Sequence, residues 1–248
     1  MKTFLWVAAA TFLTCSAQDF TWNGTVAPGK ALEIKGVNGS IHAEAASGTQ
    51  IEVTAKKTAR NSNPADVRVE VFPSENGVTI CAVYPGAGNY CGAGDQGRNS
   101  VRDNDVQVEF LVKVPAGVKF IGRNVNGDVE ARDLKSDVNV HTVNGGIEAS
   151  ATGVVEGHTV NGNIKVSMGT APSRALDFHT VNGTIEVSMP RGAGAQMDAH
   201  TVNGNIHSDF PMQVQGEMSR KNVKATLGNG GPALKLHTVN GSIRLKQA

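Results

Sequence analysis

The chain has 248 residues, of which 40% are hydrophobic and only 5% aromatic, and this length can bury a core in one or two domains. Its 23 basic and 22 acidic residues leave a formal net charge of +1, which argues against a nucleic acid or an anionic membrane held by bulk charge. The 29 glycines and 9 prolines interrupt short runs rich in Val, Ile and Thr, so the composition predicts an all-β protein.

Residues 1–17 are typical of a targeting signal. Lys2 supplies a positive start, residues 4–13 are apolar, and Cys15, Ser16 and Ala17 form a small-residue cleavage site. The apolar stretch is too short to span a bilayer, and no later segment is expected to anchor the mature chain in a membrane. We therefore expect export. A degenerate lipidation site at Cys15 is the alternative interpretation, although Thr14 before the cysteine is unusual for one.

Residues 18–115 are the less regular part of the chain. They hold one copy of the motif that recurs later, "GVNGSIHAE", followed by the strand-like runs "TQIEVTA", "VRVEV", "GVTICAVY" and "DVQVEFLVKV". Strands of this length predict a sheet or sandwich-like cap that closes the N-terminal end of the repeat region, which would otherwise expose an unpaired edge. Turn residues at 115–117 place the boundary there, so we expect a repeat domain over residues 116–248.

Two cysteines remain after cleavage, Cys81 and Cys91, an even number in an oxidising compartment. The segment between them, "AVYPGAGNY", contains Pro85, Gly86 and Gly88, which suit a turn that brings the two ends together. A disulfide is therefore predicted. A metal site would need a second cysteine pair or a nearby histidine, and a redox-active pair is usually spaced more closely.

A Val-Asn-Gly motif recurs from residue 116 onward. Its asparagines are Asn126, Asn144, Asn161, Asn182, Asn203 and Asn240, at spacings of 18, 17, 21, 21 and 37 residues. The last gap is about two periods, and the segment "GEMSRKNVKATLGNGG" within it is predicted to form a degenerate coil. Repetition at about 20 residues is typical of a solenoid or of an antiparallel meander of similar hairpins.

The solenoid and the meander use Asn-Gly differently. In a meander the pair forms a two-residue hairpin turn. In a solenoid it forms the same corner on every coil, because both residues tolerate positive φ, and the asparagines stack into a hydrogen-bonded ladder. Only stacking, at about 4.8 Å per coil, explains why His, Thr and Val recur as well. We favour a parallel β-helix-like solenoid, with the meander as the alternative, and expect Leu176, Phe178, Ile185, Val187 and Met189 inside it.

A histidine precedes five of the corners. These residues are His141, His158, His179, His200 and His237, and we expect a partly exposed histidine ladder with the first four on consecutive coils. Two stacked imidazoles could share a zinc or copper ion. Neighbouring strand positions rarely supply a tetrahedral set, however, and no cysteine or carboxylate recurs beside the histidines. The sequence therefore predicts no metal and no other cofactor.

Other chemical motifs are scarce. The chain lacks a Gly-x-Ser-x-Gly elbow, a His-Glu-x-x-His pair, a phosphate loop and a dinucleotide fingerprint. Asp103 and Asp105 lack the remaining ligands of a calcium loop and fit a polar strand entry better. Four carboxylates could approach one another on neighbouring coils, as glycoside cleavage requires, although surface charge explains them more simply: Asp128, Glu130, Asp133 and Glu148.

Several segments together resemble a known family. These are the repeated "VNG" with an apolar residue after it, "GVTICAVYP", "VPAGVKFIGRNVNGDVEA", and the stretch from "SDFPMQVQG" to "KLHTVNGSIRL". They are similar to the bacterial putative adhesin domains of unknown function, over nearly all of the mature chain. The resemblance implies an exported β-solenoid with an adhesin-like role, and it supplies no catalytic residues.

The sequence thus predicts a non-enzymatic, exported β-solenoid that binds a surface glycan or protein, or builds structure, at the cell envelope or surface. One alternative is a carbohydrate-active enzyme, because parallel β-helices often carry such sites on an outer face. The other is an assembly scaffold that self-associates by stacking the ends of its solenoids.

Overall fold

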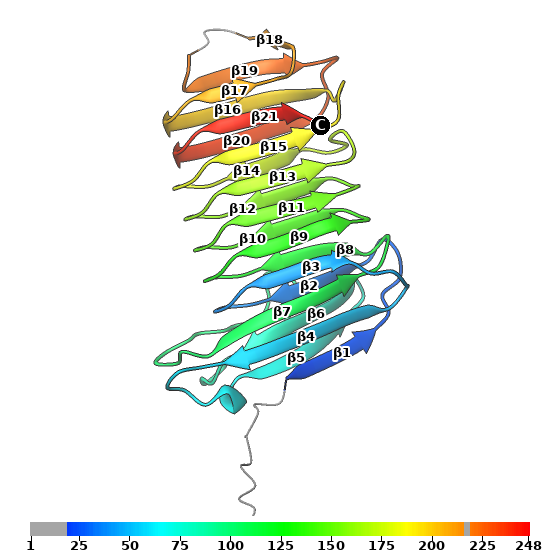
Figure 1. Ribbon diagram of the computed structural model, residues 1–248, viewed down its shortest axis with the longest axis vertical. Helices are drawn as coiled ribbons and strands as arrows, with labels where there is room; N and C mark the ends of the chain where they lie inside the picture. Colours follow the sequence, from blue (N-terminus) through cyan, green and yellow to red (C-terminus); the bar gives the residue numbers. More distant parts are fainter. Residues whose placement is uncertain (1–18, 216–218) are drawn as a thin grey trace, which may run out of the picture.

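The computed structural model describes residues 19–215 and 219–248, and the targeting signal expected at residues 1–17 lies outside them. Two sheets face each other along one tall stack (Figure 1). We call the ten-stranded sheet A and the eleven-stranded sheet B. A single turn of 3-10 helix, Pro64–Asp66, is the one helical element in the described ranges.

In spatial order, sheet A contains β1 (Phe20–Gly24), β4 (Ile51–Thr58), β7 (Gln107–Val114), β3 (Ile41–Ala45), β9 (Val129–Leu134), β11 (Ile147–Ala151), β13 (Ile164–Met168), β15 (Ile185–Met189), β21 (Ile243–Gln247) and β17 (Ile206–Ser208). Sheet B contains β18 (Met212–Val214), β19 (Asn222–Leu227), β16 (Ala195–Asn203), β20 (Ala233–Asn240), β14 (Leu176–His179), β12 (Val155–His158), β10 (Val138–His141), β8 (Lys119–Arg123), β2 (Ala31–Lys35), β6 (Gly77–Val83) and β5 (Arg68–Ser74).

Each coil consists of a strand of sheet B, a Val-Asn-Gly corner and a strand of sheet A. Successive coils pair in parallel: β10 lies between β8 and β12, and β11 lies between β9 and β13. Counterpart residues are aligned, as Ile147 is with Ile164, so the repeated sequence positions form columns along the stack. The chain is therefore a two-sheet parallel solenoid, and the meander is wrong.

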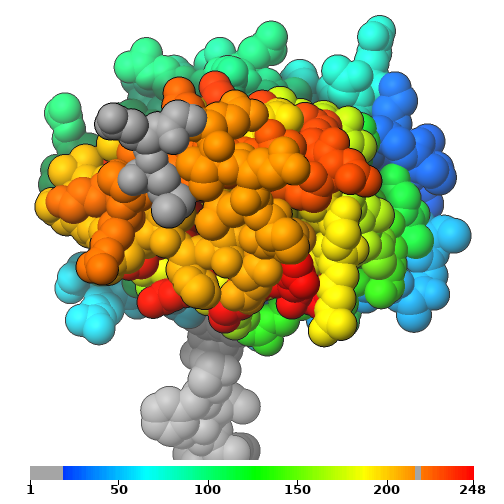
Figure 2. Space-filling view, turned by 90° about the horizontal axis from the view of Figure 1, so that it is seen from above, coloured from blue at the N-terminus to red at the C-terminus, as the bar shows by residue number. Residues whose placement is uncertain are grey.

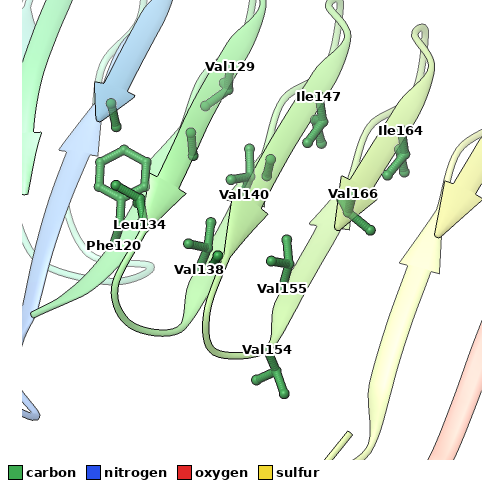
Figure 3. Packing of buried hydrophobic residues seen from close by; sticks show 14 of the residues in the cluster. Phe120, Val129, Leu134, Val138, Val140, Ile147, Val154, Val155, Ile164 and Val166 are labelled. Carbon is green, nitrogen blue, oxygen red and sulfur yellow. The ribbon is translucent and has the colours of Figure 1, made fainter. Parts of the chain in front are cut away.

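Alternation along each strand places one apolar row between the sheets. In Figure 3, valines of β10 and β12 face isoleucines of β11 and β13 across this core. The five residues predicted to lie inside are confirmed there, each at most 1% exposed: Leu176, Phe178, Ile185, Val187 and Met189. Burying a side chain of this size stabilises the fold by roughly 1.5–3 kcal/mol.

The N-terminal region continues the same stack. Strands β2 and β3 form a coil that pairs in parallel with β8 and β9 on one side and with β6 and β7 on the other. Antiparallel strands complete this end of the molecule, with β5 on β6 and β4 on β7, followed by β1 on β4. Both sheets thus continue without a break from the N-terminal region into the repeat region. The predicted domain boundary at residue 115 stays a prediction.

The C-terminal coil is inserted within the stack. Strand β20 pairs with β14 on one side and β16 on the other, and β21 likewise lies between β15 and β17. Figure 1 shows the chain end beside β21, below the last strands of the stack. The segment predicted as a degenerate coil instead contains β19, which runs antiparallel to β16. Together with β18 it covers much of this end of the molecule (Figure 2).

Candidate functional site

Each repeated corner carries the chain from sheet B to sheet A, and its threonine points inward. These buried residues, at most 5% exposed, are Thr142, Thr159, Thr180, Thr201 and Thr238. Every hydroxyl donates a hydrogen bond of 2.8–3.1 Å to the carbonyl oxygen of a corner glycine one coil away. A buried hydroxyl needs such a partner, and threonine also suits the strand that precedes the corner.

The corner glycines are required by close packing between coils. A Cβ at Gly162 would lie 2.0 Å from the carbonyl oxygen of Gly145, and one at Gly183 would lie 1.9 Å from that of Gly162. Within the described corners only Gly39 and Gly127 have positive φ, at 110° and 141°. The expectation that positive φ explains the Asn-Gly pair is therefore wrong for most corners, because an absent side chain, rather than a left-handed backbone, is what the stacking needs.

The corner asparagines form one column on the outside of the stack. In order along it they are Asn38, Asn126, Asn144, Asn161, Asn182, Asn240 and Asn203. Each Nδ2 donates to the Oδ1 of the preceding member at 2.7–2.9 Å. The column thus orders every corner relative to the next one.

The corner valines form a second outward column beside the asparagines. Its members, exposed or half-buried, are Val37, Val125, Val143, Val160, Val181, Val239 and Val202. Four of them are 38–45% exposed, which is high for large apolar side chains. Sequence reasoning did not assign these valines to a surface, although their recurrence before every Asn-Gly pair was the available signal.

The histidines form a third column, on the outer face of sheet B. The register gives the order His141, His158, His179, His237 and His200. His200 was expected next to His179, and this is wrong, because the inserted β20 places His237 between them. The rings of His141 and His158 are stacked with centroids 4.9 Å apart, and those of His237 and His200 meet edge to face at 6.3 Å.

The histidine column continues into two cations toward the N-terminus. Arg123 is the register partner of His141, and Lys35 is the register partner of Arg123. Burial, followed by the charges of His158 and Arg123, lowers the pKa of His141 to about 4. His141, at the Arg123 end of the column, therefore resists protonation.

Carboxylates with ion-pair or hydrogen-bond partners lie beside the histidine column, on the outer face of sheet B. Glu156 accepts from Arg174 at 2.9 Å and from the backbone N–H of Asp177 at 3.2 Å. Partial burial alone would raise the pKa of Glu156, but hydrogen bonds from His158 and Arg174 outweigh it and lower this pKa to about 2. The carboxylate thus stays ionised beside the histidines.

The predicted disulfide between Cys81 and Cys91 is present and closes the loop beside the column. Carbonyl oxygens of the segment that follows Cys91 surround the Lys35 ammonium, which donates to Gly92 at 2.5 Å and to Gly94 at 2.6 Å. The buried Glu33 carboxylate accepts from Thr79, from the Gly94 N–H and from Arg123, each at 2.9 Å. Sequence analysis missed this arrangement, because only the folded loop brings these groups together.

The four carboxylates considered for glycoside cleavage lie along sheet A and each has a partner on its own or a neighbouring coil. Glu130 contacts Arg132 at 2.9 Å, and Glu148 contacts Lys165 at 3.1 Å. Asp128 accepts from the backbone N–H of Gly146 at 2.7 Å, and Asp133 accepts from the Ser150 hydroxyl at 3.2 Å. The Glu130–Arg132 pair lies within β9, and the other three interactions join adjacent coils.

A shallow groove of about 400 Å³ crosses the same face of sheet A near β3 and β7. His42 lies in it, with Nε2 3.5 Å from Glu109 and Nδ1 3.2 Å from Glu130. Across residues 19–215 and 219–248, no group of three or more His, Cys, Asp or Glu side chains could hold a metal ion.

The two aspartates considered for calcium lie in one loop, and Asp105 has its own hydrogen-bond partners there. Asp105 accepts hydrogen bonds from the backbone N–H groups of Arg60, Asn61 and Ser62. These bonds, those of Ser62 first, hold the pKa of Asp105 well below its usual range. Asp103 has a φ of 48° in the same loop. Asp105 therefore anchors residues 60–62.

The stacked corners and the two sheets define a class of protein, the two-sheet parallel β-solenoid. The sequence profile of the Toastrack DUF4097 family matches residues 123–246, half of the chain, and the chain belongs to this family of unknown function. No curated protein matches it. None of the helices in the part of the chain that the structure describes is long and apolar enough to cross a membrane.

Two solved structures are similar to the chain. One is a putative cell adhesion protein from Clostridium sporogenes ATCC 15579, with 11% identity and a TM-score of 0.48, covering 93% of this chain and 100% of that one. The other is a putative adhesin from Bacteroides fragilis NCTC 9343, with 14% identity and a TM-score of 0.33, covering 94% of this chain and 98% of that one.

Proposed function

We propose that the protein is exported and acts as a non-catalytic, adhesin-like binding protein of the cell envelope or surface. The observation that carries the proposal is the corner face, which we define as the histidine, valine and asparagine columns together. The same three side chains recur there on consecutive coils. Such a periodic surface suits a repetitive partner, a surface glycan or protein array, because each coil adds one more equivalent contact.

Two further features support the proposal. The Cys81–Cys91 disulfide fits an oxidising compartment, where such bonds persist. Glu130 and Glu148, two of the carboxylates considered for an enzyme on sheet A, form ion pairs with Arg132 and Lys165. A structural role accounts for these carboxylates without any catalytic step.

The scaffold alternative receives less support from the ends of the stack. Strands β19 and β18 run antiparallel over the last coil of sheet B. A second copy stacked there would meet an edge that no longer continues the parallel coil, so we expect binding to occur along the side of the molecule.

A pull-down with envelope fractions and a glycan array tests the proposal, using the full chain exported to the periplasm. We expect the parent to bind, and we expect the variant Val143→Gln/Val160→Gln to lose most of this binding, because it removes the centre of the valine column. The matched control is Leu111→Gln, which changes an exposed apolar residue on sheet A instead. A parent that binds nothing, or equal binding by parent and valine variant, would show the proposal to be wrong.

A further inference from the structure

The threonine and asparagine columns already hold the coils together at the corners, so the recurrence of five histidines beside them calls for a further explanation. His179 and His200 are exposed, and His141, His158 and His237 are half-buried. Histidine is the side chain whose charge ordinarily changes between pH 5 and pH 8. The column is therefore a row of groups whose charge depends on pH, although burial lowers the pKa of His141 to about 4 and keeps this member neutral in mildly acidic surroundings.

The other charges that face the column balance in number. On the neighbouring row of sheet B the anionic groups are Glu33, Glu156, Asp177 and Asp198, and the cationic groups around them are Arg123, Arg174, Lys235 and Lys224. Glu33 binds Arg123 at 2.9 Å, Glu156 binds Arg174 at 2.9 Å, and Asp198 lies 3.5 Å from Lys224. Asp177 has Lys235 as its register partner.

Near the disulfide loop, Arg123 also lies 3.4 Å from Asp95, and the Lys35 ammonium is held by loop carbonyls. Glu156 lies 4.0 Å from His158, and one oxygen of Asp177 has no hydrogen-bond partner. Protonating all five imidazoles therefore adds more positive charge than these two carboxylates can neutralise. Two imidazolium groups at the 4.9 Å separation of His141 and His158 repel each other, so a bound anion would reduce this electrostatic repulsion.

The column is one side chain wide and has the apolar valine column next to it. A double helix needs a broad basic surface, and the large stacking platforms Phe, Tyr and Trp are absent among the described members of the corner face. A linear polyuronate presents a carboxylate on one edge of each sugar ring and an apolar face on the ring itself. Its carboxylates fit the imidazolium row, and its ring faces fit the valines.

We propose that the corner face binds an acidic polysaccharide of the polyuronate class, along the histidine column, when the surroundings become mildly acidic. This inference rests on the proposed function and names the ligand class of the same surface. Binding strengthens as pH falls because the charged column is the state that the ligand recognises, and by reciprocity the bound ligand holds the protons in place.

Binding to polygalacturonate, measured by calorimetry at pH 7.5 and pH 5.5, tests the inference. For the parent we expect affinity to rise at least about tenfold at pH 5.5, since each imidazolium–carboxylate contact in water contributes roughly a factor of five. Fully methyl-esterified polygalacturonate, which keeps the sugar rings but lacks the charge, should not show this rise. A variant with His141, His158, His179, His237 and His200 all changed to Asn should lose it.

The matched control is His42→Asn/His207→Asn, because these two histidines lie on sheet A. It should keep the full pH-dependent gain. Circular dichroism at both pH values establishes that each variant is folded. Imidazole NMR provides a readout on the parent alone, in which polygalacturonate should raise the titration midpoints in the column and leave those of His42 and His207 unchanged.

Several outcomes would overturn the inference. These are an equal gain in the column variant, an equal loss in the control, unmoved column midpoints, or single-stranded DNA binding as tightly as polygalacturonate with the same pH dependence. If polygalacturonate fails while envelope fractions still bind in a manner that depends on Val143 and Val160, the ligand class is wrong and the proposed function stands.

Discussion

The corner glycine sets the distance between coils. At Gly162 the neighbouring carbonyl oxygen occupies the position that a side chain would take, and both groups belong to the backbone, so neither can rotate away. The recurrence of glycine in every copy therefore reports backbone contact. A sequence that kept the asparagine and lost the glycine could not stack at this spacing.

Gly162→Ala is predicted to destabilise the protein by about 3 kcal/mol or more, because its Cβ would lie 2.0 Å from the Gly145 carbonyl oxygen. Gly48→Ala is the control, since a Cβ at Gly48 meets nothing within 4 Å and the backbone there has no positive φ. Urea unfolding measures both. Equal stability of the two variants would contradict the close-packing account.

Asn182→Ala is predicted to cost more than Asn38→Ala. Asn182 donates to Asn161 and accepts from Asn240, each at 2.7 Å, whereas Asn38, at the end of the column, has one neighbour within it and accepts from Asn126. Because water can replace part of these exposed bonds, we expect a loss of about 1–2 kcal/mol for Asn182 and about half of that for Asn38. Equal and negligible losses in urea unfolding would mean that the column contributes nothing to stability.

At the scale of the elements, the Cys81–Cys91 disulfide fixes the loop beside the histidine column. It joins Cys81 to Cys91, and the residues directly after Cys91 supply the carbonyl groups that bind Lys35 and the Gly94 N–H that binds Glu33. These groups lie at the end of the histidine column, next to Arg123. The loop thus shapes the charges at one end of the corner face.

Cys81→Ser/Cys91→Ser is predicted to lower the free energy of unfolding by about 2–3 kcal/mol, as expected for a crosslink across a short loop. The result is compared with the parent in oxidised and reduced form. Reduction of the parent should reproduce the loss, and the double variant should no longer respond to reductant. A parent whose stability is the same in both forms would refute the prediction.

Which coil lies next to which could not be predicted from the repeat alone. The copies at His200 and His237 have the same "HTVNG" sequence, so each corner can stack on the coil that ends at His179. In the structure β19 pairs antiparallel with one edge of β16, and β20 pairs in parallel with its other edge, between β16 and β14. Repetition thus predicted the solenoid and the buried alternation of Leu176 and Phe178, while long-range pairing decided the order.

The candidate site was predictable to a similar degree. The sequence indicated a histidine ladder and an asparagine ladder, because identical residues recur at one position of every copy. It did not indicate that threonine would face inward and valine outward, since both residues suit a strand. The Lys35 and Glu33 contacts depend on the loop and on three different strands, and no local pattern encodes them.

At the scale of the whole molecule, acid should loosen the stack through the histidine column. The folded chain lowers the pKa of His141 to about 4, whereas an unfolded histidine titrates near 6.5. The unfolded state therefore takes up a proton first, so stability is present above pH 6.5 and falls as pH drops toward 4. The pKa of Glu156 is about 2, so the stability that its ionised carboxylate contributes is lost only under more acidic conditions.

Thermal unfolding at pH 7.5 and pH 5 measures this effect. The parent is predicted to lose stability between the two values, and His141→Asn is predicted to lose less, because it has no group with the lowered pKa. His207→Asn, on the outer face of sheet A, serves as the control and should behave like the parent. An identical pH response in parent and His141→Asn would contradict the prediction.

The order of the columns underlies both the fold and the corner face, and a crosslinking experiment tests it most directly. Neighbouring parallel strands lie about 4.8 Å apart, within reach of a disulfide, whereas strands two coils apart do not. His179→Cys/His237→Cys should therefore form a new disulfide on oxidation, detected by peptide mass spectrometry alongside Cys81–Cys91. His179→Cys/His200→Cys should remain unlinked, since β20 lies between these positions. A crosslink between 179 and 200, with none between 179 and 237, would contradict the account.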